Sequence, residues 1–239
     1  MIFFKKKAKA KEEERPHKNM CSQPLTLTDL DEQIKNRIDV IQDEFTNGFN
    51  LIKTREKTVS FFGSTQTRPD EQDYKNAQTL ASEISKLGYG VVTGGGPGIM
   101  EAANRGAFEE KGLSIGLTIQ LPKEQITNSY LNTSLNFRYF FTRKVTLTYA
   151  AEAYVYFPGG FGTMDELFEI LTLVQTNKIE RVPIILFGSH FWNPLESFIQ
   201  KFLLETGKID EADMKLFIIT DSIDEAVEII KNAPIRSAH

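Results

Sequence analysis

The sequence has few of the residues that usually build disulfides, metal centres or histidine-based active sites. Its 239 residues include one cysteine, Cys21, and three histidines, His17, His190 and His239. A single cysteine excludes an internal disulfide and a cysteine-rich metal cluster, and it fits a reducing cytoplasm. The scattered histidines give little support to a catalytic triad or a metal site, and we interpret His190, in G-S-H-F-W, as a loop or helix-start residue. We therefore expect no bound metal.

Long apolar runs and a strong excess of positive charge are also absent. No apolar segment approaches the roughly 20 residues that a membrane-spanning helix needs. The opening M-I-F-F-K-K-K does not resemble a secretory signal, because its basic residues follow the apolar ones. A formal net charge of -4 provides no general attraction for nucleic acid or anionic lipid. We expect a soluble, cytoplasmic protein with neither nucleic acid nor membrane as a partner.

Two common nucleotide-binding motifs are missing as well. Gly94 and Gly96 begin a G-x-G pattern, but Ile99 stands where G-x-G-x-x-G requires its last glycine. No G-x-x-x-x-G-K-[ST] occurs anywhere in the chain. A dinucleotide-dependent enzyme and a P-loop NTPase are both disfavoured.

Three regions follow one another along the chain. Residues 1–24 form a charged arm that cannot bury enough apolar surface to become ordered, and we predict it to be flexible. Residues 25–52 predict an N-terminal amphipathic helix capped by Thr28 or Asp29. Its apolar residues recur at helical spacing: Leu30, Ile34, Ile38, Ile41 and Phe45. Residues 53–239 form the main domain.

In the main domain, short apolar segments alternate with helical ones. The predicted strands cover residues 58–62, 89–93, 114–119, 153–157, 183–187 and 216–219. The predicted helices cover residues 71–87, 99–111, 138–150, 164–177, 191–205 and 222–232. This alternation predicts an α/β protein, with a Rossmann-like, doubly wound parallel sheet and helices on both faces.

Three of the strand-to-helix turns have an unusual composition: F-F-G-S-T-Q, V-T-G-G-G-P-G-I-M-E and P-G-G-F-G-T-M-D-E. Each follows the carboxyl end of a predicted strand, so all three lie on one edge of the sheet. Glycines let the backbone approach a ligand closely, and the N–H groups at a helix N-terminus bind anions. A single such turn could need its glycines for conformation alone, but three on one edge favour a phosphate site. Ser64 and Thr163 are the expected hydroxyl donors.

Thr163 and Glu166 also have a purely structural interpretation. T-M-D-E matches a capping box, in which Thr163 caps a helix and Glu166 reaches back to the N–H of the cap residue. A carboxylate beside a phosphate needs another reason to be there, because like charges repel. A ribose hydroxyl or a developing cation would supply that reason.

The segment N-F-R-Y-F-F-T-R-K combines basic and aromatic residues on one predicted helix. Arg138, Arg143 and Lys144 could pair with a phosphate. Aromatic side chains could flank a base: Phe137, Tyr139, Phe140 and Phe141. The alternative is a core or subunit-contact helix with solvated charges.

Three segments together resemble the LOG family of Rossmann-like proteins, long labelled "possible lysine decarboxylase": G-G-G-P-G-I-M-E-A-A-N-R-G-A, F-F-T-R-K and P-G-G-F-G-T-M-D-E-L-F-E. The similarity covers about residues 57–205, and the N-terminal helix is similar to that of the longer subgroup. The resemblance implies a phosphoribohydrolase that splits a nucleoside 5'-monophosphate, such as AMP or a cytokinin riboside monophosphate, into free base and ribose 5-phosphate. It also implies a homodimer or a multiple of a dimer.

The resemblance assigns roles to individual residues. Arg143 and Glu166 match the catalytic pair of the family, and a carboxylate can stabilise the oxocarbenium-like state of glycosidic cleavage. The implied substrate-binding residues are Ser64, Gly95, Gly96, Glu101, Lys144, Gly159, Gly160, Phe161, Gly162 and Thr163.

We expect no cofactor. The decarboxylase label would imply pyridoxal phosphate on a lysine, but Lys144 is the only lysine in the three motifs and nothing around it resembles a pyridoxal site. The alternative to an enzyme is a non-catalytic nucleotide-binding or carrier module of the same superfamily. Both need the glycine loops, but only the enzyme needs the charge of Glu166. The sequence does not specify the base.

Overall fold

A computed structural model of the chain describes residues 27–53, 57–121 and 126–234. The predicted arm over residues 1–24 lies outside the described residues. The chain divides into two compact units, residues 1–39 and 40–239. Helix α1 (Leu27–Ile52) begins in the first unit and ends in the second. It starts before Thr28 and Asp29, so the prediction that one of them caps the helix is wrong, and both lie inside its first turn.

The larger unit contains a seven-stranded parallel sheet in the order β4-β3-β2-β1-β5-β6-β7. The strands are β1 (Thr58–Phe62), β2 (Gly90–Thr93), β3 (Ser114–Ile119), β4 (Thr133–Phe137), β5 (Ala153–Tyr156), β6 (Ile184–Phe187) and β7 (Ile218–Thr220). The predicted α/β class and parallel sheet are confirmed. Only β4 was missed, because T-S-L-N-F is an edge strand whose side chains are mostly exposed or half-buried, so it lacks an apolar run.

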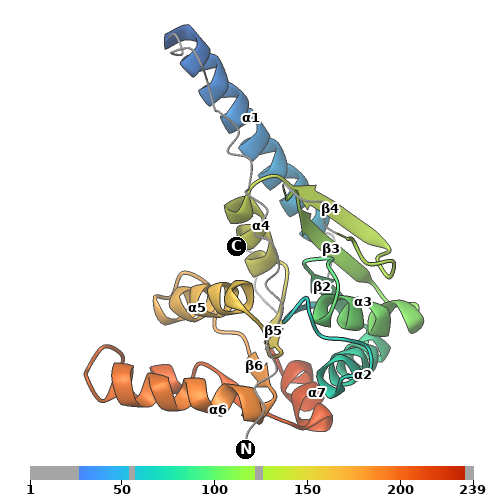
Figure 1. Cartoon of the computed structure of the whole chain (residues 1–239), viewed down its shortest axis with the longest axis vertical. Coiled ribbons are helices and arrows are strands. Elements are labelled where there is room, and N and C mark those ends of the chain that lie inside the picture. Colours follow the sequence, from blue (N-terminus) through green and yellow to red (C-terminus); the bar gives the residue numbers. More distant parts are fainter. Residues whose placement is uncertain (1–26, 54–56, 122–125, 235–239) are drawn as a thin grey trace, which may run out of the picture. The chain divides into compact units, whose positions relative to one another are not determined.

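Helices cover both faces of the sheet (Figure 1). Those of the larger unit are α2 (Gln72–Lys86), α3 (Ile99–Glu109), α4 (Phe140–Tyr149), α5 (Phe161–Gln175), α6 (Ser189–Phe198) and α7 (Ile223–Lys231). Helices α2, α3 and α7 share one buried core with the sheet, whereas α4, α5 and α6 share the other. A π-helical turn (Ile199–Leu204) extends α6, and a 3₁₀ turn (Asp213–Lys215) precedes β7. His190 lies in the first turn of α6, as expected.

The order of the strands places a topological switch point between β1 and β5. From β1 the chain builds outwards through β2, β3 and β4, and then crosses back to add β5, β6 and β7 on the other side of β1. In doubly wound folds, ligands bind at the carboxyl ends of the two strands where the order reverses. Two of the three glycine-containing turns follow β1 and β5, and the third follows β2, the neighbour of β1.

Residues 27–53, 57–121 and 126–234 lack two kinds of feature. None of the helices there is both long enough and apolar enough to pass through a bilayer. No group of three or more histidine, cysteine, aspartate or glutamate residues is arranged to hold a metal ion in this part of the chain.

Candidate functional site

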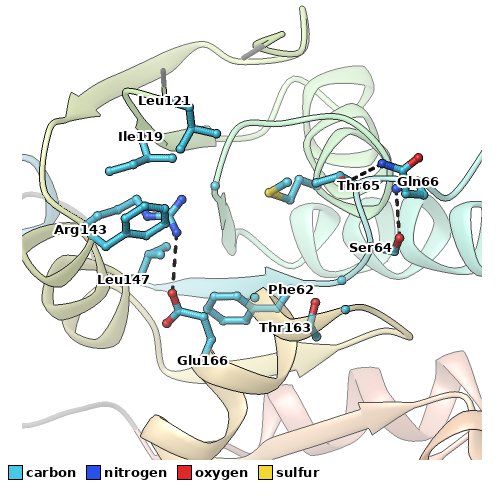
Figure 2. Close-up of a pocket in the computed structure, with 16 residues that line it drawn as sticks. Phe62, Ser64, Thr65, Gln66, Ile119, Leu121, Arg143, Leu147, Thr163 and Glu166 are labelled. Atoms are coloured by element: carbon cyan, nitrogen blue, oxygen red, sulfur yellow. Dashed lines mark hydrogen bonds and ion pairs between the residues drawn. The ribbon is translucent and has the colours of Figure 1, made fainter. Parts of the chain in front are cut away.

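A pocket of about 330 Å³ opens at the switch point, lined by the turns after β1 and β2, the end of β3, and helices α4 and α5. Figure 2 shows Ser64, Thr65 and Gln66 on one side of it and Arg143 with Ile119 on the other. The three turns that the sequence singled out thus contribute to one hollow. Each supplies at least one lining residue.

The first turn of α5 forms the part of the pocket best suited to an anion. Gly160 is the N-cap of α5, and both Gly160 and Gly162 line the pocket. Neither glycine has a positive φ, and an added Cβ at either would meet no atom within 4 Å. The fold therefore does not demand glycine at these positions, and the space that side chains would fill stays open. Because the first N–H groups of a helix lack intrahelical acceptors, an anion in that space would be stabilised.

Thr163 and Glu166 do not form the capping box that T-M-D-E suggested. Helix α5 begins at Phe161, so Thr163 lies in its first turn and Glu166 in its second. The N-cap, Gly160, makes no side-chain capping bond. The capping-box interpretation is wrong because the glycines let the helix start two residues earlier than Thr163. Both side chains are buried and line the pocket instead.

Gly159 supports Thr163 rather than lining the pocket. A Cβ at Gly159 would lie 2.1 Å from Thr163 Oγ1, so glycine is needed here to accommodate the threonine side chain. Of the P-G-G-F-G-T residues, Gly160, Gly162 and Thr163 line the pocket, whereas Phe161 points into solvent and is 95% exposed.

The turn after β1 is bonded to both other turns. The Ser64 N–H donates to the carbonyl of Pro158 (3.0 Å), and the Ser64 carbonyl accepts from the N–H of Ile99 (3.0 Å). Ser64 Oγ accepts from the N–H of Gln66 (3.0 Å). Gly98 has a φ of +72°, and a Cβ there would lie 2.2 Å from the Ser64 carbonyl oxygen, so only glycine allows this contact. The three turns are therefore held as one rigid rim.

The turn after β2 supplies Gly94 to the pocket, but not the predicted Gly95 and Gly96. The Gly95 N–H donates to Thr93 Oγ1 (2.8 Å), and its carbonyl accepts from the Asn128 N–H (2.9 Å). Asn128 Nδ2 donates to the carbonyl of Gly96 (3.0 Å). Gly95 and Gly96 thus form the hydrogen bonds that hold the turn, and they do not line the pocket themselves. Asn128 lies far from the motifs in sequence, and no signal there pointed to it.

Arg143 and Glu166 face each other inside the pocket (Figure 2). Arg143 Nη2 lies 3.8 Å from Glu166 Oε1, and their side chains are only 14% and 7% exposed. The guanidinium lies over the Phe140 ring, 5.3 Å from its centre. Two of their buried polar atoms, Arg143 Nε and Glu166 Oε2, have no hydrogen-bond partner among the described residues. A buried pair with unpaired atoms is costly, which is typical of a functional site.

Burial also changes the protonation of this pair. Desolvation raises the pKa of Glu166 to about 7, although Arg143 and Lys144 oppose the shift and Glu169 and Asp165 add to it. Desolvation likewise lowers the pKa of Arg143, opposed by the charges of Glu166 and Asp165. The guanidinium stays protonated at neutral pH, as arginine does in proteins. Glu166 can therefore gain or lose a proton near neutrality.

Besides Gly95, Gly96, Gly159 and Phe161, two further predicted substrate-binding residues, Lys144 and Glu101, do not line the pocket. Lys144 pairs with Asp165 (2.9 Å) and Glu169 (2.7 Å) of α5. Glu101 accepts a hydrogen bond from the Tyr74 hydroxyl (2.9 Å). Both residues belong to the motifs that carry the family resemblance, but their side chains bond other residues instead of lining the pocket.

Apolar side chains complete the pocket. They come from four elements that the sequence could not bring together: Phe62, Met100, Ile119, Leu121, Phe140 and Leu147. Of the four aromatic residues considered as base-flanking, only Phe140 lines the pocket, and Phe137 is fully buried in the core. Thr65 and Gln66 also line it, and their place in F-F-G-S-T-Q was the available signal.

Comparison with known proteins gives consistent matches. The sequence profile of the family described as "Possible lysine decarboxylase" matches residues 100–230. The cytokinin riboside 5'-monophosphate phosphoribohydrolase LOG5 of Arabidopsis thaliana is 24% identical over 180 residues, which are 74% of this chain and 78% of that protein. A Mycobacterium marinum protein of the same activity name is 23% identical over 154 residues, covering 64% of this chain and 82% of its own.

Solved structures match the fold over most of their length. The X-ray structure of TM1055 is 25% identical, with a TM-score of 0.57, and covers 73% of this chain and 98% of its own. The molybdenum cofactor carrier protein of Chlamydomonas reinhardtii is 20% identical, with a TM-score of 0.57. The match covers 74% of this chain and 97% of the carrier protein. The second of these likenesses concerns the fold alone.

Proposed function

Because the chain belongs to the possible lysine decarboxylase (LOG) family, we propose that it is a phosphoribohydrolase acting on a nucleoside 5'-monophosphate. The substrate is of the AMP or cytokinin riboside monophosphate type, and the products are the free base and ribose 5-phosphate. One observation carries the proposal: a desolvated carboxylate, Glu166, shares a pocket with Arg143 and with an open helix N-terminus.

The 5'-phosphate binds in the first turn of α5. The open space at Gly160 and Gly162 admits its oxygens, and the helix N-terminus compensates its charge. Thr163 and Ser64 provide hydroxyl groups at the edge of this space. The apolar side chains of Phe140, Ile119 and the other residues of that group surround the base, which has a flat apolar face.

Glu166 acts on the ribose. As the bond from C1' to the base nitrogen breaks, positive charge develops on the sugar ring, and the ionised carboxylate stabilises it. A water oxygen forms the new bond to C1', and Glu166, with a pKa of about 7, accepts the water's proton. The leaving nitrogen carries away the electron pair of the broken bond and takes up the proton that Glu166 received from the water, which returns the carboxylate to its ionised form. Arg143 stabilises the negative charge that builds on the base.

The alternative is a nucleotide-binding or carrier module without turnover, such as the molybdenum cofactor carrier protein that shares the fold. A carrier needs the open helix N-terminus, but it has no use for a carboxylate that is buried next to it at a cost in stability. The unpaired Glu166 Oε2 and Arg143 Nε therefore favour the enzyme.

The discriminating experiment measures free base released by the purified protein from a panel of nucleoside monophosphates. Glu166→Gln should abolish release, whereas the matched control Asp165→Asn, an exposed carboxylate on the same helix, should keep it. Release from AMP should greatly exceed release from adenosine, because adenosine lacks the phosphate. Equal rates for wild type and Glu166→Gln would remove Glu166 from the mechanism, and no release from any monophosphate would favour the carrier.

The protein acts as a homodimer or a multiple of a dimer. Helices α4 and α5 expose large apolar side chains that a single copy does not cover: Phe140, Phe141, Tyr149, Phe161 and Phe168. Large apolar side chains exposed on two helices favour an interaction with another protein surface. Phe161, next to the proposed phosphate site, would then be covered by the second copy.

A further inference from the structure

A buried carboxylate outside all three motifs contacts the start of α4. Glu44 lies in the half of α1 that belongs to the larger unit, and it is only 9% exposed. Its Oε1 accepts from the N–H of Arg138 (2.5 Å), and its Oε2 accepts from the N–H of Tyr139 (3.4 Å). The Thr142 hydroxyl lies 2.5 Å from Oε2. Both carboxylate oxygens of Glu44 thus accept hydrogen bonds at the start of α4.

Helix α4 begins without a side-chain cap of its own, so its start depends on contacts from other elements. Its N-cap residue, Tyr139, makes no side-chain capping bond. Glu44, from a distant part of the chain, accepts from the N–H of the N-cap residue and from that of the residue before it, and its negative charge stabilises the positive end of the helix. Arg143 follows one turn later, where its N–H donates to the carbonyl of Tyr139 (3.3 Å). The point at which α4 begins therefore fixes the direction in which Arg143 leaves the helix.

The packing of α1 against α4 leaves little room for adjustment. A Cβ at Gly48, one turn after Glu44, would lie 2.6 Å from Thr146 Oγ1, one turn after Thr142. Next to this contact, the rings of Phe45 and Phe141 lie 6.3 Å apart. Helix α1 thus supports one side of α4, while another side presents Arg143 to the pocket.

We propose that Glu44 is a positioning residue for Arg143: by fixing the N-terminus of α4, it holds the guanidinium opposite Glu166. The consequence for turnover rests on the proposed function, but the consequence for the geometry of the pair does not. The test therefore needs one measurement that is independent of turnover.

That measurement is the titration of Glu166 in the ligand-free, full-length protein. Carboxyl signals of ¹³C-glutamate are followed by NMR against pH, and the signal lost in Glu166→Gln is that of Glu166. The charged groups that face Glu166 are Arg143, Lys144, Asp165 and Glu169. If Glu44→Ala lets Arg143 move away, Glu166 loses the attraction that holds its pKa down, and its midpoint should rise by roughly one unit.

The direction in which the Glu166 midpoint moves distinguishes a displaced Arg143 from the mere loss of the Glu44 charge. Removing the charge of Glu44 would by itself lower the Glu166 midpoint, because one nearby negative charge is lost. The matched control is Asp43→Asn, which removes an exposed charge from the preceding position and should leave the midpoint unchanged. In an Arg143→Ala background, Glu44→Ala should produce no further rise, because the residue through which it acts is gone.

Glu44→Gln keeps the shape of the side chain and one acceptor oxygen, so this variant should fold even if Glu44→Ala does not. It should raise the Glu166 midpoint less than Glu44→Ala does. If monophosphates are cleaved, Glu44→Ala should lower kcat roughly 10- to 100-fold. The part of the pH profile in which activity rises with pH should move to higher pH. Asp43→Asn should resemble wild type in both respects. Absence of turnover in wild type would refute the proposed function and leave the NMR result decisive. An unchanged Glu166 midpoint in folded Glu44 variants, or an equal rise with and without Arg143, would overturn the proposal.

Discussion

Arg143 and Glu166 approach each other to 3.8 Å inside the pocket, yet each keeps a buried polar atom without a hydrogen-bond partner. A pair that served stability alone would close to hydrogen-bond distance, because unsatisfied buried groups cost about 1–3 kcal/mol each. The open arrangement leaves both groups able to bind a third. Such an arrangement suits a site in which the unpaired atoms of both side chains contact a reacting molecule and stabilise charge on it.

The first prediction concerns stability and pH. Because burial raises the Glu166 pKa to about 7 from its ordinary 4.5, its contribution to stability is fully present below about pH 4.5 and is lost as pH rises through 7. Glu166→Gln does not ionise, so relative to wild type it should gain up to about 3 kcal/mol between pH 4.5 and pH 8. Denaturant unfolding at both pH values measures this. A constant difference between the two proteins would contradict the raised pKa.

The second prediction concerns the rate of hydrolysis. If ionised Glu166 is the catalytic form, kcat/KM should rise about tenfold per pH unit below pH 7 and then level off, because kcat/KM reports the pKa of the free enzyme. The measurement is base release from AMP between pH 5 and pH 9 at AMP concentrations well below KM. Asp165→Asn removes a carboxylate that helps to raise the Glu166 pKa. In this variant the pH range over which activity rises should therefore move to lower pH. A flat profile would point to a different group.

The third prediction separates two kinds of glycine. An alanine at Gly162 meets open space and favours the helix, so Gly162→Ala should keep or slightly raise the melting temperature. It should nevertheless raise the KM for a monophosphate at least roughly tenfold, because the methyl group occupies the proposed phosphate space. Gly98→Ala is the contrast: its positive φ and the 2.2 Å contact should make it strongly destabilising. Unchanged KM in Gly162→Ala would place the phosphate elsewhere.

The fourth prediction concerns assembly. Phe161 is 95% exposed in a single copy, so Phe161→Asp should not affect folding of the monomer but should weaken a dimer that buries it. Sedimentation velocity of wild type and variant over a range of concentrations measures this. Lys178→Asp, on an exposed position after α5, is the control and should sediment like wild type. A monomeric wild type would reject the dimer outright.

Particular elements show how far local sequence signals reach. The buried strands β1, β3 and β5 were found because their apolar runs are continuous, whereas β4 escaped because an edge strand needs no such run. The start of α5 was misplaced for a related reason. T-M-D-E has the residues of a capping box, but two glycines upstream allowed the helix to begin earlier.

The sequence by itself determined the alternation of strands and helices, and with it the edge of the sheet on which the glycine turns meet. It determined these because apolar periodicity and glycine act over a few residues. Only the tertiary structure decided which residues line the pocket: the motif residues Lys144 and Glu101 do not, whereas Gly94 and, from outside the motifs, Ile119 do. It also decided the desolvation of Glu166 and the contact of Glu44 with α4. Burial and contacts across about a hundred residues depend on packing between elements, which no local pattern encodes.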